Sequence, residues 1–429
     1  MWTSVLKQMW NCKRSNIWIA MELLLVFCLT WYLVDFLFVI CYNYNIPNHR
    51  NVENTWQINL GKLNESHPDY SPAANEPEVL EANYTRILQT IHNYPGIESV
   101  GISFDGSTPG VSSYYGRGYR SATDTSLIAA GQAITIYPGE DFFKVFRFST
   151  DNGSKMISNR DFEWGANGII LSRSIANILF PNGSAIGQEI TTYDMDSRYT
   201  VICVLDDNKR FDYLRPQNYF YLSRNLDAGN LKRAELSVRY NSSLPEKKFR
   251  EQFKSDMTNS LQIGNFYLLS VIPYTKIGED TAKQFGVNNE INIRIYMILF
   301  FLVCIFLCLI GTFWYRVSLR PNEIGLRKAI GASSNNIHYS LIIEGVWLLL
   351  IIVLPAMLIE FQFVQAGLID TVGREREINP EYLPDRTFLR FMITNAITFI
   401  CILIIIALAI WLPARKGASL VPAEALHCE

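Results

Sequence analysis

The stretch Tyr296–Tyr315, YMILFFLVCIFLCLIGTFWY, decides the fold class of this chain, because its 20 residues include no charged side chain. An α-helix needs about 20 predominantly apolar residues to cross the hydrocarbon core of a bilayer. A buried helix of a soluble protein rarely runs this far without a polar face. The stretch therefore predicts a membrane-spanning helix, which we place at residues 291–315.

Three other stretches are apolar enough to span a bilayer, and we place them at residues 17–42, 340–360 and 388–412. The first could instead be a cleaved signal peptide, but its apolar region is longer than the ~7–15 residues of such signals and no small-x-small cleavage site follows. We expect it to remain as a permanent anchor. The sequence thus predicts an integral membrane protein with four transmembrane α-helices and a large α+β extracytoplasmic domain, residues 43–290, inserted between helices 1 and 2.

Lysine and arginine indicate which side of the membrane each segment faces, because they are enriched on the cytoplasmic side. Residues 1–16 carry three of them and no acid, and residues 316–339 carry four against Glu323 alone. The tail, residues 413–429, has two. We expect these segments and both termini in the cytoplasm, and the domain and the loop 361–387 outside a bacterial inner membrane. The net charge of -2 argues against nucleic acid as a partner.

The extracytoplasmic domain carries no recognisable catalytic or metal-binding motif. It lacks G-x-S-x-G, H-E-x-x-H and paired His/Cys spacings, and we therefore predict no enzyme and no metal site. Asp206-Asp207 resembles an acid/base or metal pair, although an Asp-rich turn after a strand is far more common. Cys304 and Cys308 lie one helical turn apart within an apolar span, where packing is a better explanation than metal binding.

Local patterns in this domain alternate between helix and strand. Residues 77–94 predict an amphipathic helix, and the next stretch, 97–104, predicts a half-buried strand. Residues 199–207, YTVICVLDD, predict a buried strand. The pattern becomes helical again over 245–261, and we expect this last helix to lead into the second span.

Three acidic residues lie within the predicted spans, namely Glu22, Asp35 and Glu344. A charge at the centre of a bilayer costs roughly 3 kcal/mol. Glu22 and Asp35 each lie about 7–10 Å from a helix end at 1.5 Å per residue, so their side chains could reach the interface. The alternative is contact with another span or a second copy of the chain. Reaching the interface suits Glu22 better than Asp35.

The segment Arg316–Ser333, RVSLRPNEIGLRKAIGAS, predicts a short basic helix at the cytoplasmic membrane face. Pro321 suits a first helical turn, where its missing N–H is no loss. Glu323 and Arg327 are spaced i,i+4, which adds about 0.3–0.5 kcal/mol. Gly331 favours a helix stop, and Ser333 or its neighbour can cap the next helix. Binding of anionic lipid would explain the positive charge, but it does not require this ordered pattern.

This segment resembles the cytoplasmic loop of the FtsX/MacB-type ABC transporter permeases, in which an R-x-x-EIG-x-R-x-A-x-GAS pattern links the second and third spans. Segments 141–148, 169–191 and 199–207 look like the MacB-type periplasmic core domain, and the tail 413–426 is similar to the closing pattern of the family. The resemblance covers nearly the whole chain. Departures include Cys203, where a Gly is usual, and a longer outer loop at 361–387.

The resemblance implies a coupling helix that docks on an ABC ATPase subunit. Its residues would be Arg320, Glu323, Ile324, Gly325, Arg327, Lys328, Gly331, Ala332 and Ser333. Residues 1–16 predict an amphipathic helix that either contacts the ATPase or anchors at the lipid surface. The chain contains no G-x-x-x-x-G-K-S/T sequence, so ATP and Mg are expected in the partner and no cofactor in this chain.

The family implies a permease subunit that couples ATP hydrolysis to conformational change of the periplasmic domain, termed mechanotransmission, for export or efflux. Four spans are too few to enclose a pathway, so we expect a homodimer or a pair with a paralogous permease, surrounded by membrane lipid. A periplasmic adaptor is a further candidate partner. The alternatives are a lipoprotein-releasing or envelope-regulating permease and, from another class, a membrane-anchored sensor. The substrate is not encoded in any recognisable motif.

Overall fold

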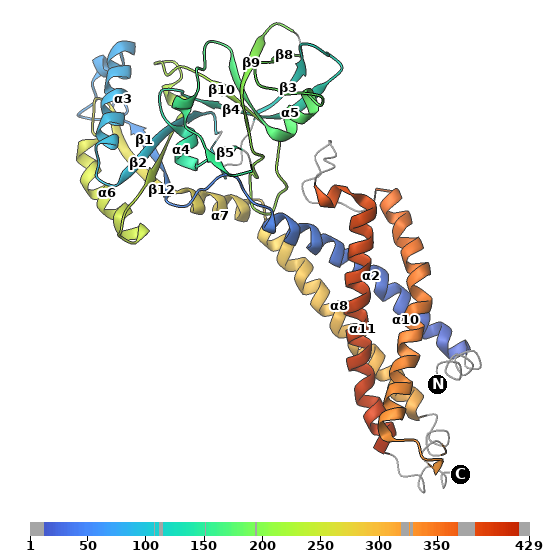
Figure 1. Cartoon of the computed structure of the whole chain (residues 1–429). Coiled ribbons are helices and arrows are strands. Elements are labelled where there is room, and N and C mark those ends of the chain that lie inside the picture. The colour runs from blue at the N-terminus through green and yellow to red at the C-terminus, as the bar shows by residue number, and fades with distance from the viewer. Residues whose placement is uncertain are drawn as a thin grey trace. The chain divides into compact units, whose positions relative to one another are not determined.

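The computed structural model describes residues 13–106, 108–110, 115–150, 152–193, 195–318, 326, 329–367 and 382–419. The chain divides into two compact units, one formed by residues 1–43 and 288–429 and the other by residues 44–287 (Figure 1). Among the described residues, four helices are long and apolar enough to cross a membrane, at Ile17–Asn45, Val287–Tyr315, Asn335–Gln365 and Thr387–Trp411. The predicted fold class, four transmembrane helices with an α+β domain between the first and second, is confirmed.

The membrane unit consists of α2 (Lys13–Asn45), α8 (Val287–Ser318), α10 (Ser334–Gln365) and α11 (Thr387–Ser419). Its core takes large apolar side chains from every helix, including Phe27, Leu309, Leu349 and Ile406. Helices α10 and α11 run side by side (Figure 1). Gly345 permits this contact, because a Cβ there would lie 2.5 Å from Ile410 Cδ1.

The extracytoplasmic unit is built on a ten-stranded mixed sheet with the order β10-β7-β9-β8-β3-β4-β2-β11-β1-β12. Parallel pairing of β10 with β4 closes the six strands β10-β7-β9-β8-β3-β4 into a ring, and β2, β11, β1 and β12 continue from it. The strands are β1 (Thr55–Lys62), β2 (Ile97–Phe104), β3 (Tyr115–Ser121), β4 (Ile128–Ile136), β7 (Gly168–Ser172), β8 (Glu189–Thr192), β9 (Arg198–Leu205), β10 (Tyr219–Ser223), β11 (Ala234–Tyr240) and β12 (Phe266–Pro273). A separate hairpin pairs β5 (Ser149–Thr150) with β6 (Lys155–Met156).

One half of this unit packs α3 (Pro77–His92) and α6 (Glu246–Ser260) on β2, β11, β1 and β12. Figure 1 shows both helices beside these strands. Trp56 is completely buried at the centre and stacks on Tyr240 with ring centroids 4.3 Å apart. Alternate residues of the strands supply the apolar layer, which is the period-2 pattern expected for a sheet with one covered face.

The other half contains two short helices, α4 (Phe142–Phe146) and α5 (Arg173–Leu179). The aromatic residues around α4 form a buried cluster with β10 and Trp164. Asp141 caps α4 by accepting the Lys144 N–H at 3.1 Å. Four short 3₁₀ helices, at Pro72–Asn75, Asn159–Asp161, Leu231–Arg233 and Leu383–Asp385, complete the described elements.

The structure corrects the expected route from the domain into the second span. The helix predicted over 245–261 is α6, but β12 and α7 (Tyr274–Gln284) separate it from α8. β12 is easily missed, since its partner β1 lies about 210 residues earlier in the chain, as in the Ile58–Val271 pair. Helix α10 begins directly after the predicted cap at Ser333, and its first residues precede the predicted span 340–360.

Candidate functional site

Of the residues predicted to form the coupling helix, the structure describes Gly331, Ala332 and Ser333. Gly331 has φ +97°, a conformation that L side chains rarely adopt. The Ser333 side chain accepts the Asn336 N–H at 3.3 Å and caps α10. The helix stop and the cap thus lie where the sequence placed them. The other candidate residues of this loop lie outside the described residues, namely Arg320, Glu323, Ile324, Gly325, Arg327 and Lys328, as do residues 1–12.

A buried ion pair connects α2 to α11 inside the membrane unit. Arg390 donates from Nε to Asp35 Oδ1 at 2.8 Å, and its Nη2 also binds Asp35 Oδ2. Asp35 is 2% exposed and Arg390 is 8% exposed, so the protein shields both charges from solvent. Of the two alternatives for Asp35, contact with another span is the one found. Arg390 was not singled out from the sequence, because it lies at the first turn of the predicted fourth span.

Polar side chains continue this α2–α11 seam below the ion pair. Trp31 donates its Nε1–H to Thr394 Oγ1 at 2.9 Å, and Thr394 donates its hydroxyl to the Arg390 carbonyl at 3.0 Å. Asn395 Nδ2 donates to the Phe391 carbonyl at 3.0 Å. The seam therefore joins the two helices by directional bonds as well as by apolar packing.

Glu360 of α10 completes the polar cluster. It is 0% exposed, and neither carboxyl oxygen has a hydrogen-bond partner among the described residues. Its electrostatic neighbours are Asn395 and Asp35. Asn395 Oδ1 is likewise buried without a partner in the described part of the chain. We refer to Asp35, Arg390, Glu360 and Asn395 as the intramembrane polar cluster.

The other two predicted intramembrane acids do not join this cluster. Glu22 is half-buried and interacts with the Cys308 thiol of α8. It lies 13 residues before Asp35 on one helix, about 20 Å along the axis. Glu344 is 5% exposed and lies 16 residues before Glu360, about 24 Å along α10. Of the three predicted acids, Asp35 is the one that belongs to the intramembrane polar cluster.

In the extracytoplasmic unit, the chain that leaves α2 is fastened to the loop after β9. Arg50 donates from Nε and Nη2 to the Lys209 carbonyl at 3.0 and 2.6 Å, and from Nη2 to the Arg210 carbonyl at 2.7 Å. Lys209 Nζ donates in return to the Ile46 carbonyl at 2.8 Å. Asn48 binds the Lys209 backbone in both directions. We call these contacts between residues 46–50 and 209–210 the linker clasp.

Burial accounts for the strength of the clasp. Lys209 is 2% exposed, and desolvation lowers the pKa of Lys209 and of Arg50 below their usual ranges. Each cation is held by carbonyl oxygens, whose hydrogen bonds to a charged group contribute about 1.5–3 kcal/mol each. The clasp is therefore a rigid attachment between the linker and the β9–β10 loop.

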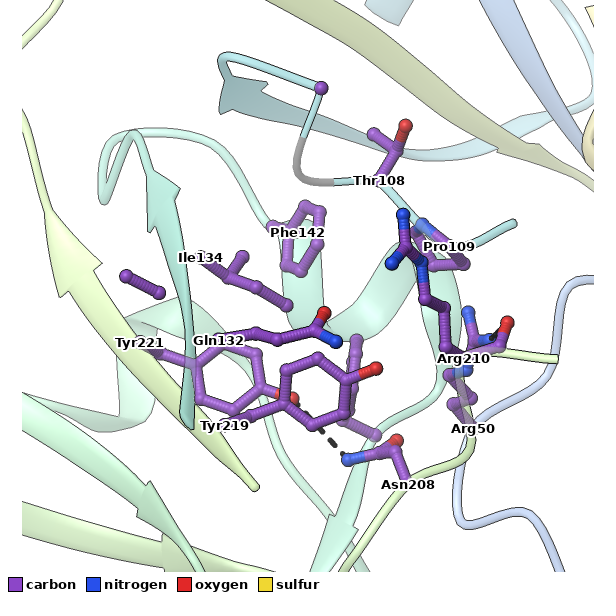
Figure 2. A pocket seen from close by; sticks show the side chains of 13 residues that line it. Arg50, Thr108, Pro109, Gln132, Ile134, Phe142, Asn208, Arg210, Tyr219 and Tyr221 are labelled. Atoms are coloured by element: carbon purple, nitrogen blue, oxygen red, sulfur yellow. Dashed lines mark hydrogen bonds between the residues drawn. The ribbon is translucent and has the colours of Figure 1, made fainter. Parts of the chain in front are cut away.

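A small pocket adjoins the clasp, and Arg50 and Asn208 line it (Figure 2). Its volume is about 30 Å³, room for one or two water molecules. Figure 2 shows Arg50 and Arg210 on one side and Tyr219 and Tyr221 on the other. Asn208 Nδ2 donates to the Tyr221 hydroxyl at 3.3 Å. The described lining is cationic and aromatic, without a carboxylate, and contains no nucleophile–base pair.

Comparison with known proteins identifies the family. Residues 42–256 match the MacB-like periplasmic core domain, and residues 295–422 match the FtsX-like permease C-terminal domain. The chain belongs to the MacB/FtsX family of ABC-type permeases. FtsX-like permeases are generally non-catalytic membrane subunits of ABC transporters, a family that implies an ATPase partner. It is a multi-pass membrane protein with an extracytoplasmic domain.

Three solved structures are similar to parts of the permease. The periplasmic region of MacB from Actinobacillus actinomycetemcomitans is 10% identical, covers 54% of this chain and 93% of that chain, and has a TM-score of 0.32. The extracellular domain of the noncanonic ABC-type transporter YknZ from Gram-positive bacteria is 15% identical, with 51% and 100% coverage and a TM-score of 0.29. A domain of a Porphyromonas gingivalis protein described as a permease is 12% identical, with 52% and 91% coverage and a TM-score of 0.30. No curated protein matches the chain significantly.

Asp206 and Asp207 have structural roles in the permease. Asp206 accepts hydrogen bonds from Arg173 at 2.6 Å and from the Asn152 and Gly153 N–H groups at 3.0 and 2.8 Å. Burial alone would raise the pKa of Asp206, but these bonds lower it overall. Asp207 accepts from the Ser174 N–H at 3.0 Å, at the first turn of α5. No group of three or more metal-binding side chains occurs in the part of the chain that the structure describes.

Proposed function

We propose that the permease transmits movement, driven by ATP hydrolysis in a separate ABC ATPase subunit, to its extracytoplasmic domain and thereby supports export. The linker clasp carries this proposal. A transmembrane helix can move an outer domain only if the connecting chain is stiff, and a free linker would absorb the displacement. Here the first residues after α2 are held by half-buried Arg50 and buried Lys209, and the displacement of α2 would reach the β9–β10 loop.

The second connection to the membrane enters the domain at a different place. β12 leads through α7 into α8, and β12 pairs with β1 in the half of the domain covered by α3 and α6. The linker after α2 is instead fastened by the clasp to the loop between β9 and β10, in the other half. A relative movement of the two helices would therefore change the geometry between the halves of the domain, which is the kind of output mechanotransmission requires.

On the cytoplasmic side, the coupling residues would be those of the loop 316–333, with the nucleotide and Mg bound by the ATPase. Both chain termini would share this side. A pair of permeases, either identical or paralogous, would complete the assembly, because the described helices present many apolar side chains outward, including Phe300 at 64% and Leu307 at 61% exposure.

Co-purification with the ATPase tests the proposal. Wild-type permease is expected to bind the ATPase and stimulate its hydrolysis, and Glu323→Lys is expected to lose both. Glu429→Lys, a charge reversal of equal size outside the family's closing pattern, is the matched control and should retain them. A Glu323→Lys variant with full complex formation and stimulation would disprove the coupling assignment.

Cysteine labelling from outside the cell tests the orientation. Ser66, an exposed residue of the extracytoplasmic unit, is a suitable site for a single cysteine. Labelling is expected at position 66 and not at position 325, and labelling at 325 alone would reverse the proposed topology. Strand residues such as Val100 are unsuitable, since this side chain is fully buried.

A further inference from the structure

The intramembrane polar cluster contains three acceptor atoms that lack a donor. They are the two carboxyl oxygens of Glu360 and the side-chain oxygen of Asn395, all buried and without a partner among the described residues. Glu360 is 0% exposed and Asn395 is 5% exposed. Buried polar atoms in folded proteins are nearly always hydrogen-bonded, so three buried oxygens without hydrogen bonds need an explanation.

Arg390 does not supply a donor to these atoms. Arg390 directs Nε and Nη2 to the carboxylate of Asp35, and Nη1 lies 3.5 Å from the Pro384 carbonyl. An ionised carboxylate buried without a partner carries a desolvation penalty of several kcal/mol. A negative charge on Glu360 would therefore oppose the packing in which it is found.

The hydrogen bonds of the Asn395 amide indicate that the missing group is a hydrogen-bond donor. Its Nδ2 already donates to the Phe391 carbonyl at 3.0 Å, and its oxygen is buried without a donor among the described residues. Glu360 as a carboxylate also offers only acceptors. Two acceptors cannot bond to each other, but one proton on Glu360 converts its carboxyl into a donor to Asn395 Oδ1. A single proton therefore satisfies atoms on both α10 and α11.

We propose that Glu360 is a proton-binding site, and that its carboxylic acid O–H donates to Asn395 and fastens α10 to α11. The groups that face it are Asp35 and Cys28 from α2 and Asn395 from α11, and Asp35 is bound in turn by Arg390. Asp35 and Arg390 neutralise each other, so the cluster is neutral when Glu360 holds its proton.

The proton links the packing of α10 on α11 to proton concentration. A movement that separates the two helices and admits water removes the penalty on the charged form, and Glu360 releases its proton to water. By linkage, the packed arrangement is then favoured as pH falls and disfavoured as pH rises. Any ATP-driven separation of these helices would release one proton per permease.

Infrared spectroscopy of the full-length permease in lipid nanodiscs tests the proton directly. The difference spectrum of wild type minus Glu360→Gln is expected to contain the carbonyl band of a protonated carboxylic acid, with a shift in D₂O. Glu22→Gln, which changes a half-buried acid on α2, is the matched control and should lack that band. A Glu360 difference spectrum with only ionised carboxylate bands would overturn the proposal.

Thermal unfolding of the same samples gives a second, independent readout. Glutamine keeps a donor to Asn395, so Glu360→Gln should retain the wild-type melting temperature at neutral pH, while Glu360→Ala should melt lower. The wild-type melting temperature should fall with rising pH more steeply than that of Glu360→Gln. Equal losses in the glutamine and alanine variants would mean that the negative charge is required, which contradicts a protonated Glu360.

Discussion

Breaking the ion pair between Asp35 and Arg390 should destabilise the membrane unit far more than removing both charges together. Asp35→Asn removes the bonded counter-charge of a guanidinium that is 8% exposed and weakens two charge-assisted hydrogen bonds. Such bonds contribute about 1.5–3 kcal/mol each, and breaking a buried pair from one side typically costs about 3–5 kcal/mol. We expect a loss in this range for Asp35→Asn, and also for Arg390→Met.

The double variant Asp35→Leu with Arg390→Met removes the charges and fills similar volumes. Replacing a buried ion pair by apolar residues is often neutral or stabilising, so this variant should cost less than about 1 kcal/mol. A double-mutant cycle on Asp35→Leu and Arg390→Met then gives a coupling energy of about 3 kcal/mol or more.

Reversible unfolding of the purified permease in mixed micelles with increasing detergent denaturant measures these free energies, with tryptophan fluorescence as the signal. Glu22→Gln, on the same helix but half-buried, is the control and should change stability by less than about 0.5 kcal/mol. Additive single losses, each below about 1 kcal/mol, would refute the buried ion pair.

Three further predictions concern other parts of the permease. Arg50→Met should leave ATP hydrolysis by the complex intact and lower export, because it removes three hydrogen bonds of the linker clasp; equal export at equal ATPase rate would contradict a force-bearing clasp. Asp206→Asn should cost about 2–4 kcal/mol at neutral pH in urea unfolding. Since folding lowers the pKa of Asp206, the wild-type advantage is present above its unfolded pKa and is lost as pH falls through the folded pKa, so the two unfolding curves should converge in acid. Gly345→Val should destabilise the α10–α11 contact by about 1–3 kcal/mol, since a Cβ there meets Ile410. Gly311→Val is the control in the same mixed-micelle assay and should have little effect, because a Cβ there meets nothing within 4 Å.

The four spans could be predicted from sequence, because the membrane imposes a requirement that is local. A run such as 296–315 is long, apolar and uncharged, and no tertiary context is needed to interpret it. The start of α10 could also be predicted from the sequence, since Gly331 and Ser333 have intrinsic preferences for a helix stop and an N-cap. Strands β1 and β12 were not, because each is defined by a partner about 210 residues away, as in the Gln57–Ile272 pair.

In the intramembrane polar cluster too, the sequence reveals local features but not contacts between distant residues. The sequence displays Asp35 as an acid within an apolar run, but its periodicity does not say which helix it faces. Arg390 and Glu360 lie near the ends of spans, where a charge ordinarily reaches the interface and needs no partner. Only packing reveals that all three point inward. A charge within about three turns of a span end thus deserves the same scrutiny as one at its centre.

Charge balance in the cluster leads to a last prediction that joins the ion pair to the proton. The buried groups are one guanidinium and two carboxyls, and the cluster is neutral only if one carboxyl holds a proton. Asp35→Asn removes the charged carboxyl and leaves Arg390 as the only ion. The least costly way to restore neutrality is then the loss of the proton from Glu360, whose carboxylate would balance the guanidinium. The infrared band assigned to protonated Glu360 should therefore weaken or vanish in Asp35→Asn and persist in Asp35→Glu, which keeps the charge. Persistence of the band in both variants would show that Asp35 and Glu360 are electrostatically independent, although they interact in the structure.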